Sequence, residues 1–518
     1  MKRILSIITI ALTATSIAIA QSEFDALKFI QPEITGTARY TSMAGAFGAL
    51  GGDPSAIKDN PAGLGIYRKS ELTATLGINT QKTSTSWRNG YATTEGLYKP
   101  VFNNLSYVLA IPVSSYSNTN LVQSNFSFSF NRLKNFDRNI RINGGVGSPS
   151  SLTDYLAYFS EPFTGYDLYE DTEYDPYSNI DIPWMSVLAA NAGLISENNQ
   201  GWTSVLEPNE TVSPYYTSRE QGYLNEFAVS WSGNFNNRLF LGATLNFYDL
   251  NYHAETEYSE TFSLDGYLTL LNTFKSNATG LGLKLGSIYA PLDYLRLGLS
   301  LQTPVVYNVK DYHYADLKYG YQTQNGFIND KEMTPEGDNN YKLQGPFTYN
   351  LSGSFILGNK AVIGLEYAAS LNSGSKFMDI NNNTFYHSYE NDSIKAFFNK
   401  QTMIKIGGEY KLTDHFSIRA GYAFAGPATS DKLRKEFNPN TIRTDVEFFV
   451  PNGSTQYLTA GLGYRESNWY IDLAVMNKVY DEKFYAYNSN KLALNRANVA
   501  GIVTTSNINV IGTIGLRF

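Results

Sequence analysis

Apolar and polar residues alternate along most of this chain, with the period of two that fits a β-strand with one apolar and one polar face. In residues 295–302, for example, four leucines alternate with Arg296, Gly298, Ser300 and Gln302. Many such segments are close to the roughly 9–11 residues that a tilted strand needs to cross a bilayer. Fourteen can be delimited, at residues 71–81, 104–113, 124–133, 226–233, 239–251, 281–289, 294–302, 349–357, 361–369, 401–410, 416–423, 455–464, 469–477 and 508–518.

The connections between these segments alternate in length. Those that follow odd-numbered segments span 22 to 92 residues, whereas those that follow even-numbered segments span 3 to 10. Long loops at one end and tight turns at the other are typical of outer-membrane barrels. We therefore predict that residues 69–518 form an all-β fold, a transmembrane antiparallel β-barrel of about 14 strands. A soluble β-sandwich is the alternative, but sandwiches rarely keep every long loop at one end.

Residues 1–20 have the pattern of a secretory signal peptide. Lys2 and Arg3 precede an apolar stretch at 4–18, and small residues at 18 and 20 fit a cleavage site before Gln21. A membrane-anchor helix is the alternative, and the short apolar run without a following basic flank argues against it. An exported chain with a barrel pattern is expected in the outer membrane of a Gram-negative cell.

Residues 21–68, which precede the first strand segment, are not strand-like. Small residues dominate, and Asp53-Pro54 predicts one short helical turn that Asn60-Pro61 closes. A barrel of fourteen strands has a bore too wide for side chains alone to fill, so either water or a plug must occupy it. We expect residues 21–68 to form a hatch inside the bore.

The chain resembles the FadL-type long-chain fatty-acid channels, a family that includes transporters of aromatic hydrocarbons. The most specific match runs from Gly36 through a Gly/Ala-rich lead to Asn60-Pro61-Ala62, and weaker matches lie at 280–304 and 404–427. The resemblance implies a hatch-closed barrel of fourteen strands that takes up hydrophobic compounds, such as long-chain fatty acids, by passive diffusion. Ligands would pass from an outer-loop groove to a lumen pocket and leave sideways toward the bilayer. The resemblance also implies that Asn60, Pro61 and Ala62 hold the hatch and that Phe24, Leu27 and Phe29 reach the pocket.

Several charged residues fall on the polar face of the alternation and should point into the bore. They are Lys284, Arg296, Glu366, Lys405, Glu409, Arg419 and Arg517. A cation among them could pair with the carboxylate of a fatty acid, which makes all but Arg517 candidates for the ligand pocket. The alternative is that these charges pair with one another or with the hatch.

The connection at residues 134–225 is longer than the family resemblance leads us to expect. Its stretches 151–160 and 184–195 carry apolar residues at helical spacing. Trp184, Met185, Val187 and Leu188 could present an apolar surface that catches an insoluble ligand. The alternative is a loop that packs on itself over the barrel mouth.

Composition argues against several other functions. The chain has no cysteine, which excludes thiolate chemistry and disulfides, and its net charge of -7 gives no basic surface for nucleic acid. The four histidines lack helical i, i+4 spacing, and the calcium-like pattern at 379–390 lacks its required glycine. We expect no metal, no cofactor and no enzymatic activity. A haem or small-solute receptor or a porin on the same barrel remains the alternative, with an outer-membrane lipid hydrolase less favoured.

The last residue, Phe518, lies on the apolar face of the final strand segment. A terminal aromatic residue of this kind resembles the feature by which the barrel-assembly machinery recognises outer-membrane proteins. We expect that machinery and the surrounding outer-membrane lipid to be partners of the chain, and we expect the barrel to be a monomer.

Overall fold

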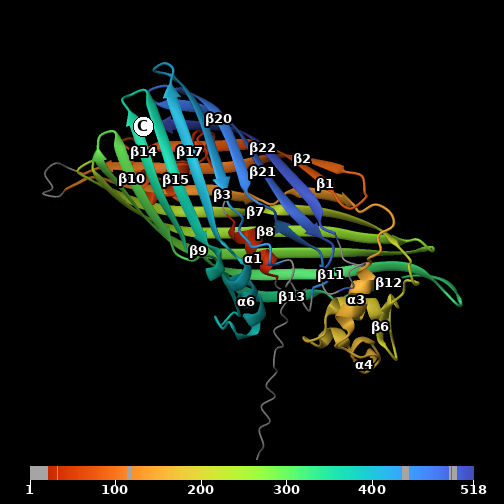
Figure 1. The fold of residues 1–518 in the computed structure, drawn as a ribbon. Helices are drawn as coiled ribbons and strands as arrows, with labels where there is room; N and C mark the ends of the chain where they lie inside the picture. Colours follow the sequence, from red (N-terminus) through yellow and green to blue (C-terminus); the bar gives the residue numbers. More distant parts are fainter. Residues whose placement is uncertain (1–21, 32, 114–119, 434–442, 489–491, 493–498) are drawn as a thin grey trace, which may run out of the picture.

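The computed structural model describes residues 22–31, 33–113, 120–433, 443–488, 492 and 499–518. Fourteen antiparallel strands form a closed barrel, because the last strand pairs with the first (Figure 1). In ring order they are β1 (Glu71–Ser86), β2 (Thr93–Pro112), β3 (Leu121–Asn135), β7 (Val212–Phe235), β8 (Leu239–Phe262), β9 (Gly266–Leu292), β10 (Leu295–Gln302), β14 (Thr348–Leu357), β15 (Ala361–Leu371), β17 (Lys400–Lys411), β18 (Phe416–Ala425), β20 (Thr455–Arg465), β21 (Trp469–Tyr485) and β22 (Gly501–Arg517). Every predicted segment coincides with one of these strands and extends beyond it by one residue at most, so the predicted fold class is confirmed. The proposed signal peptide lies outside the described residues.

Several strands are much longer than the sequence predicted, because the sheet continues beyond its apolar band. β7 and β8 have 24 residues each and β9 has 27, whereas β14 and β18 have 10. The barrel is therefore tall on one side and low on the other. Further strands extend the wall at its outer end: β4 (Arg138–Asn143), β11 (Val306–Thr323), β12 (Gly326–Met333), β13 (Gly337–Gln344), β16 (Lys376–Met378) and β19 (Phe448–Pro451).

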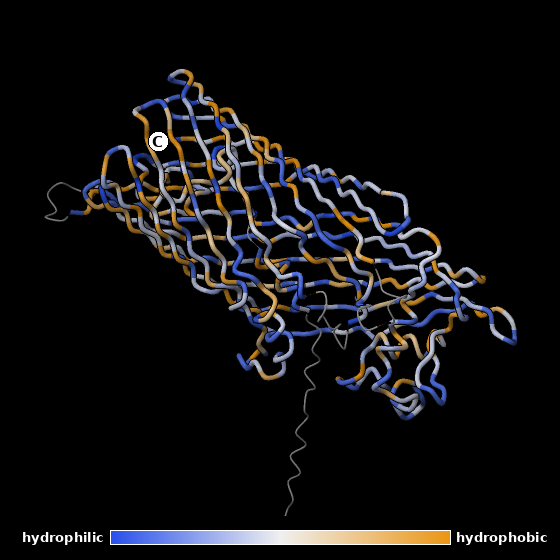
Figure 2. Tube along the Cα trace, in the orientation of Figure 1, coloured by the Kyte–Doolittle hydropathy of each residue, from blue (hydrophilic) through white to orange (hydrophobic). Residues whose placement is uncertain are grey.

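Hydrophobic and hydrophilic residues alternate along the strands in Figure 2. The apolar residues of this alternation are exposed on the outside of the wall. On β10, Leu297, Leu299 and Leu301 point outward and are exposed, whereas Ser300 is buried on the bore side. In lipid every backbone group must find a partner within the protein, and ring closure supplies those partners. Phe518 is also exposed on the outer face, where its ring stacks against that of Tyr107.

Residues 22–68 lie inside the bore, where most of their side chains are buried. The segment contains α1 (Glu23–Ile30), α2 (Ala38–Ser42) and the 3₁₀ helices η1 (Pro54–Lys58) and η2 (Pro61–Ile66). Asp53 caps η1 as predicted, since its side chain accepts a hydrogen bond from the Ser55 amide. The predicted turn ends at Lys58, before Asn60-Pro61, and Asn60 also caps a second helix, η2, that was not predicted.

Seven wall glycines let the hatch lie against the barrel. A Cβ atom at any of them would lie less than 3.0 Å from an atom of the hatch. They stand on seven strands of the wall: Gly242, Gly286, Gly298, Gly364, Gly407, Gly421 and Gly461. We call this set the glycine belt. It allows the hatch backbone to contact the wall backbone on these seven strands.

The long outer connection folds into a compact unit whose core continues into the upper wall of the barrel. It contains α3 (Leu152–Ser160), α4 (Gly165–Leu168), η3 (Pro176–Ser178), α5 (Trp184–Asn191), β5 (Ile195–Asn198) and β6 (Gly201–Ser204). Trp184, Met185, Val187 and Leu188 are all buried, at 6, 2, 0 and 0% exposure. The expected accessible apolar surface is therefore not present, and the structure has the alternative, a loop packed on itself.

A second outer connection carries η4 (Asn372–Gly374), η5 (Phe385–His387) and α6 (Ser388–Phe397), which contacts α1. Among the described helices, none is long and apolar enough to cross a membrane.

The glycine belt predicts a sharp difference between two neighbouring residues of β17. Gly407→Val should displace the hatch, because a Cβ atom there would overlap Met43, and a steady ion conductance should appear in planar bilayers. Gly408→Val is the matched control, since its Cβ atom would lie 3.7 Å from the nearest neighbour. Equal conductance in the two variants would contradict the role of the belt.

Candidate functional site

Residues 33–68, the part of the hatch that follows α1, are called the lower hatch below. A chain of ion pairs fixes this part to the wall. Arg39 of α2 donates to Glu409 of β17 at 2.8 Å, and Glu409 also accepts from Arg419 of β18 at 2.5 Å. Arg419 in turn donates to Asp472 of β21 at 2.6 Å. Two guanidinium groups thus face two carboxylates, and the charges are balanced within the network. The alternation placed Glu409 and Arg419 in the bore correctly, and here they bind the hatch and each other.

A second buried network holds the middle of the hatch. Lys405 lies 2.8 Å from Glu366 and 3.4 Å from Asp59, so it joins β17 and β15 to the hatch. Glu366 also accepts a hydrogen bond from the Gly48 amide at 2.9 Å. The hydroxyl of Tyr40 donates to Asp59. These groups satisfy one another, which a buried charged network requires.

Three further side chains hold backbone atoms of the hatch. Arg296 donates to the Leu50 carbonyl at 2.8 Å, and Lys284 donates to the Lys58 carbonyl. Asn60 donates to the Gly48 carbonyl at 2.7 Å and to the Ser287 carbonyl at 3.1 Å. Pro61 and Ala62 lie directly against Gly242 of the belt. Asn60 therefore links two parts of the hatch to β9.

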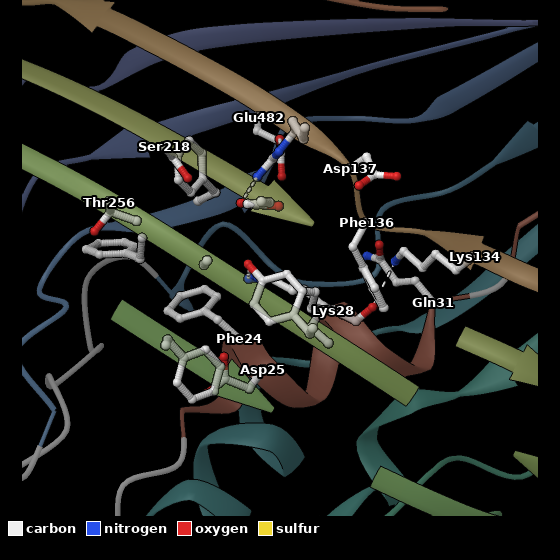
Figure 3. Close-up of a pocket in the computed structure, with 18 of the residues that line it drawn as sticks. Phe24, Asp25, Lys28, Gln31, Lys134, Phe136, Asp137, Ser218, Thr256 and Glu482 are labelled. Carbon is white, nitrogen blue, oxygen red and sulfur yellow. Dashed lines mark hydrogen bonds and ion pairs between the residues drawn. The ribbon is translucent and has the colours of Figure 1, made fainter. Parts of the chain in front are cut away.

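An outer cavity of about 210 Å³ lies beside α1 (Figure 3). Phe24 and Leu27 of α1 line it, and Ser218 and Thr256 lie on the strands that face the helix. The lining includes charged groups that are mostly paired, such as Arg138, which contacts Glu220 and Glu482. Aromatic side chains thus form the walls of the cavity, and the charged side chains between them are mostly paired with one another.

An inner cavity of about 220 Å³ lies between α1 and the lower hatch. Phe29 lines it, together with Leu133, Tyr248 and Tyr307 among other wall residues. The two cavities adjoin, because Gln31, Glu33 and Lys134 line both. Displacement of α1 would join the two volumes into one.

Lysines dominate the charge of the inner cavity. Four lysines and three carboxylates line it: Lys58, Lys134, Lys284 and Lys405, with Glu33, Asp59 and Glu226. Lys58, Lys134 and Lys284 donate to main-chain carbonyl groups. In the described part of the chain, none of these three forms an ion pair with a carboxylate. Buried ammonium groups without an anionic partner are suited to receive one from a ligand.

Residues 443–451 cross the bore above α1. Burial disfavours the charge of Arg443, but Asp25 and Asp445 hold the pKa of its guanidinium above the usual value. Burial, and after it the neighbouring Asp445, raises the pKa of Glu447 to about 7. Arg443 is therefore charged, and Glu447 gains a proton in the neutral range.

The wall has a seam above the middle of β2. β2 pairs with β1 along Thr93–Pro112, but it pairs with β3 only from Asn104 to Pro112. β3 and β4 stay attached to β7 instead. Two ion pairs cross the seam, Lys99–Asp137 at 2.5 Å and Arg141–Glu95 at 3.0 Å. The outer and inner cavities border it, and so does a smaller cavity of about 40 Å³ beside Thr35 and Gly36, since residues between 132 and 138 line each of them.

The sequence-predicted pocket residues thus divide into three groups. Phe29, Lys284 and Lys405 meet at the inner cavity, and Phe24 and Leu27 line the outer one. Arg296, Glu366, Glu409 and Arg419 line neither of these two cavities, because they hold the hatch. The four apolar residues of α5 are separate from both cavities. Whether any of these residues contacts a ligand stays a prediction.

Several important residues were not singled out by sequence reasoning. Lys58 and Lys134 lie outside the alternating segments, and Arg443 lies in a connection with no pattern. The glycine belt had a signal, because its members fall on the polar face of strands at similar depth. Within the described ranges, no group of three or more histidine or acidic side chains is placed to hold a metal ion.

Comparisons with known proteins agree with this geometry. The family model described as Outer membrane protein transport protein (OMPP1/FadL/TodX) matches residues 229–513, more than half of the chain. A FadL homologue from Pseudomonas aeruginosa is 13% identical, with a TM-score of 0.52 over 94% of this chain and 100% of that one. A deltaS2 mutant of TodX, a monoaromatic hydrocarbon channel, is 12% identical, with a TM-score of 0.51 over 93% and 99%. At these identities the two structures show a shared fold. No curated protein matches the sequence.

Asn60→Ala should weaken hatch docking by about 2–3 kcal/mol, because two buried carbonyl groups lose their donor and η2 loses its cap. The expected result is a lower urea concentration at which planar-bilayer conductance rises. Asn199→Ala, an exposed substitution in the outer connection, is the control. An unchanged urea midpoint in Asn60→Ala would show that this side chain does not hold the hatch.

Proposed function

The chain belongs to the OMPP1/FadL/TodX family of outer membrane transport proteins, and we propose that it is a passive channel for hydrophobic compounds with one anionic group, such as long-chain fatty acids. The observation that carries this proposal is the inner cavity. Its aromatic and aliphatic walls suit an acyl chain, and its lysines suit a carboxylate. The TodX relative is a monoaromatic hydrocarbon channel, and a neutral hydrocarbon would leave these lysines without a partner.

The charge balance of the inner cavity favours a monoanion. Four ammonium groups line the cavity with three carboxylates, and Glu33 is also bound by Lys478 at 2.7 Å from outside the cavity. Lys405 is shared between Asp59 and Glu366. A single carboxylate head group near Lys58, Lys134 and Lys284 would supply a partner that the protein lacks there.

We assign gating to α1 rather than to the lower hatch. The lower hatch is fixed by the glycine belt and by buried ion pairs with the wall, so its release would expose many unpaired groups. α1 separates the two cavities and has few polar links to its surroundings. A ligand would pass from the outer to the inner cavity when α1 moves. Asn60, Pro61 and Ala62 serve to keep the floor closed during this movement.

We propose that the ligand leaves through the seam between β2 and β3. The hatch is held on the periplasmic side by the glycine belt and by ion pairs, whereas in the described residues the seam has no backbone hydrogen bonds and borders the cavities. Opening the seam requires that the two ion pairs separate and that Thr85 and Thr93 release the main-chain carbonyl group of Arg141. The route would deliver an acyl compound toward the bilayer, the medium in which it is most soluble.

The proposal also covers the export of the chain, its assembly into the membrane and its oligomeric state. Export through a signal peptide at 1–20, recognition of Phe518 by the barrel-assembly machinery and a monomeric state all belong to it. The hatch inside the bore argues against an open porin, since it contacts seven strands of the wall at the glycine belt. The family consists of transport proteins, and we propose no enzymatic activity.

Lys134→Gln and Lys284→Gln should each lower the affinity for a long-chain carboxylate about tenfold, because a charge-assisted hydrogen bond is lost. Affinity for the primary alcohol of the same chain length should not change. Binding of both ligands to the purified channel by calorimetry measures the difference. Lys82→Gln, on the exposed face of β1, is the control. Equal losses for the acid and the alcohol would reject a carboxylate site.

Locking the seam should stop uptake. The chain has no cysteine of its own, so Lys99→Cys and Asp137→Cys can be joined by a short bis-maleimide in an otherwise unchanged channel. Uptake of a labelled fatty acid should fall to the level of cells without the channel. The control pair is Thr80→Cys with Ile508→Cys, which already face each other in the β1–β22 pairing. Persistent uptake after complete cross-linking at the seam would exclude it as the exit.

A further inference from the structure

Residues 443–451, which we call the strap, span the bore above α1. At one end Phe448–Pro451, strand β19, pairs with β21. At the other end Thr444 donates to Asn272 of β9, and Glu447 accepts from Thr256 of β8 at 2.8 Å. β21 and β9 stand on opposite sides of the ring, seven places apart in the order of fourteen strands. The strap is therefore anchored to both sides of the wall.

The strap binds α1 through an ion pair and an aromatic stack. Asp25 of α1 pairs with Arg443, and both side chains are only 5% exposed. Phe24 of α1 stacks on Phe448 at 5.4 Å, and Phe448 stacks on Tyr485 of β21 at 4.9 Å. The contacts join α1 to the strap along one face of the helix.

Asp25 also shapes α1 itself. Its side chain accepts a hydrogen bond from the Ser22 amide at 3.2 Å, which completes the capping box at the start of the helix. The same carboxylate thus stabilises the helix and fixes it to the strap. Loss of the ion pair need not unfold α1, because an amide at this position could still accept the capping bond.

We infer that the strap locks α1 across the bore and that the Asp25–Arg443 ion pair is the latch that must open before the outer and inner cavities join. The inference rests on the proposed function, because the latch would control the passage of a ligand. The opening of the latch can be measured without any ligand.

Arg443 has other contacts that remain when the Asp25–Arg443 ion pair opens. Arg443 also donates to Asp445 at 2.6 Å, and its guanidinium lies 4.0 Å from the ring centre of Phe274. When α1 moves away, the cation therefore keeps a carboxylate and an aromatic face. Breaking a buried ion pair costs several kcal/mol when it leaves a charged group without a partner. Here Arg443 still has Asp445, a residue of the strap, as its partner.

The latch also explains why α1, and not the lower hatch, is the movable part. Besides Asp25, the polar links between α1 and the wall include a hydrogen bond from Lys28 to Tyr252 at 2.6 Å. The lower hatch has several buried ion pairs and the glycine belt. Release of the Asp25–Arg443 ion pair thus removes a buried charged contact of the helix that divides the cavities, while the ion pairs of the lower hatch stay in place.

Thiol accessibility tests the latch in the full chain, since the natural sequence has no cysteine. Ala26→Cys places a reporter at a fully buried position of α1, and the probe is a membrane-impermeant maleimide added to the folded channel. Asp25→Asn and Arg443→Gln should each raise the labelling rate about tenfold or more, because the latch is lost. Arg443→Lys should give an intermediate rate, since one ammonium cannot replace a guanidinium that serves two carboxylates.

Asp445→Asn is the matched control. It removes a carboxylate from the same guanidinium but leaves the Asp25–Arg443 pair, so its labelling rate should stay within about twofold of the parent. Asn199→Cys, an exposed position, should react at one rate in every background, and heat modifiability on gels verifies the folded barrel. If Asp25→Asn and Arg443→Gln label no faster than Asp445→Asn, the inference is wrong.

Uptake of a labelled fatty acid by the same variants separates this inference from the proposed function. Faster labelling without uptake in any variant would reject the proposed substrate and keep the latch. Normal uptake with unchanged labelling would reject the latch and keep the proposed function.

Discussion

The structure follows from the fate of backbone hydrogen bonds in lipid. A sheet in that medium must close into a ring, and a ring of fourteen strands encloses more space than its own inward side chains can fill. The remaining space must hold either water or another part of the chain. Here residues 22–68 occupy it, and the position of every functional feature depends on how that segment is held.

The hatch has two parts that differ in how they are bound. The lower part approaches the wall so closely that only glycine fits on seven strands, and its charged contacts are balanced and buried. α1 lies between two cavities and is held from above by a strap that ends on opposite walls. The same segment thus provides a fixed floor and a movable partition. At the seam, backbone pairing between β2 and β3 stops, and side chains make the contacts between the two edges of the wall.

The sequence predicted the wall well because a strand with one apolar face leaves a local signal. Each of the fourteen segments, and the inward direction of Glu366, Lys405, Glu409 and Arg419, followed from a period of two. The extent of β7, β8 and β9 could not be predicted, since beyond the apolar band both faces of those strands are polar or enclosed. The burial of Trp184 and Met185 in the outer connection depended on tertiary packing that spacing does not encode. The pairing of Asp25 with Arg443, 418 residues apart in the chain, has no local signal at all.

The glycine belt has a consequence for how such a channel can diversify. Each of its seven positions excludes any larger side chain while the hatch is in place. Single substitutions at these positions therefore cannot give this level of the bore a new lining. Descendants of this chain that acquire new specificities must change above that level, in α1, the strap, the upper wall or the outer connections. Sequence divergence among close homologues should therefore be concentrated toward the cell exterior, with an invariant ring of glycines beneath it.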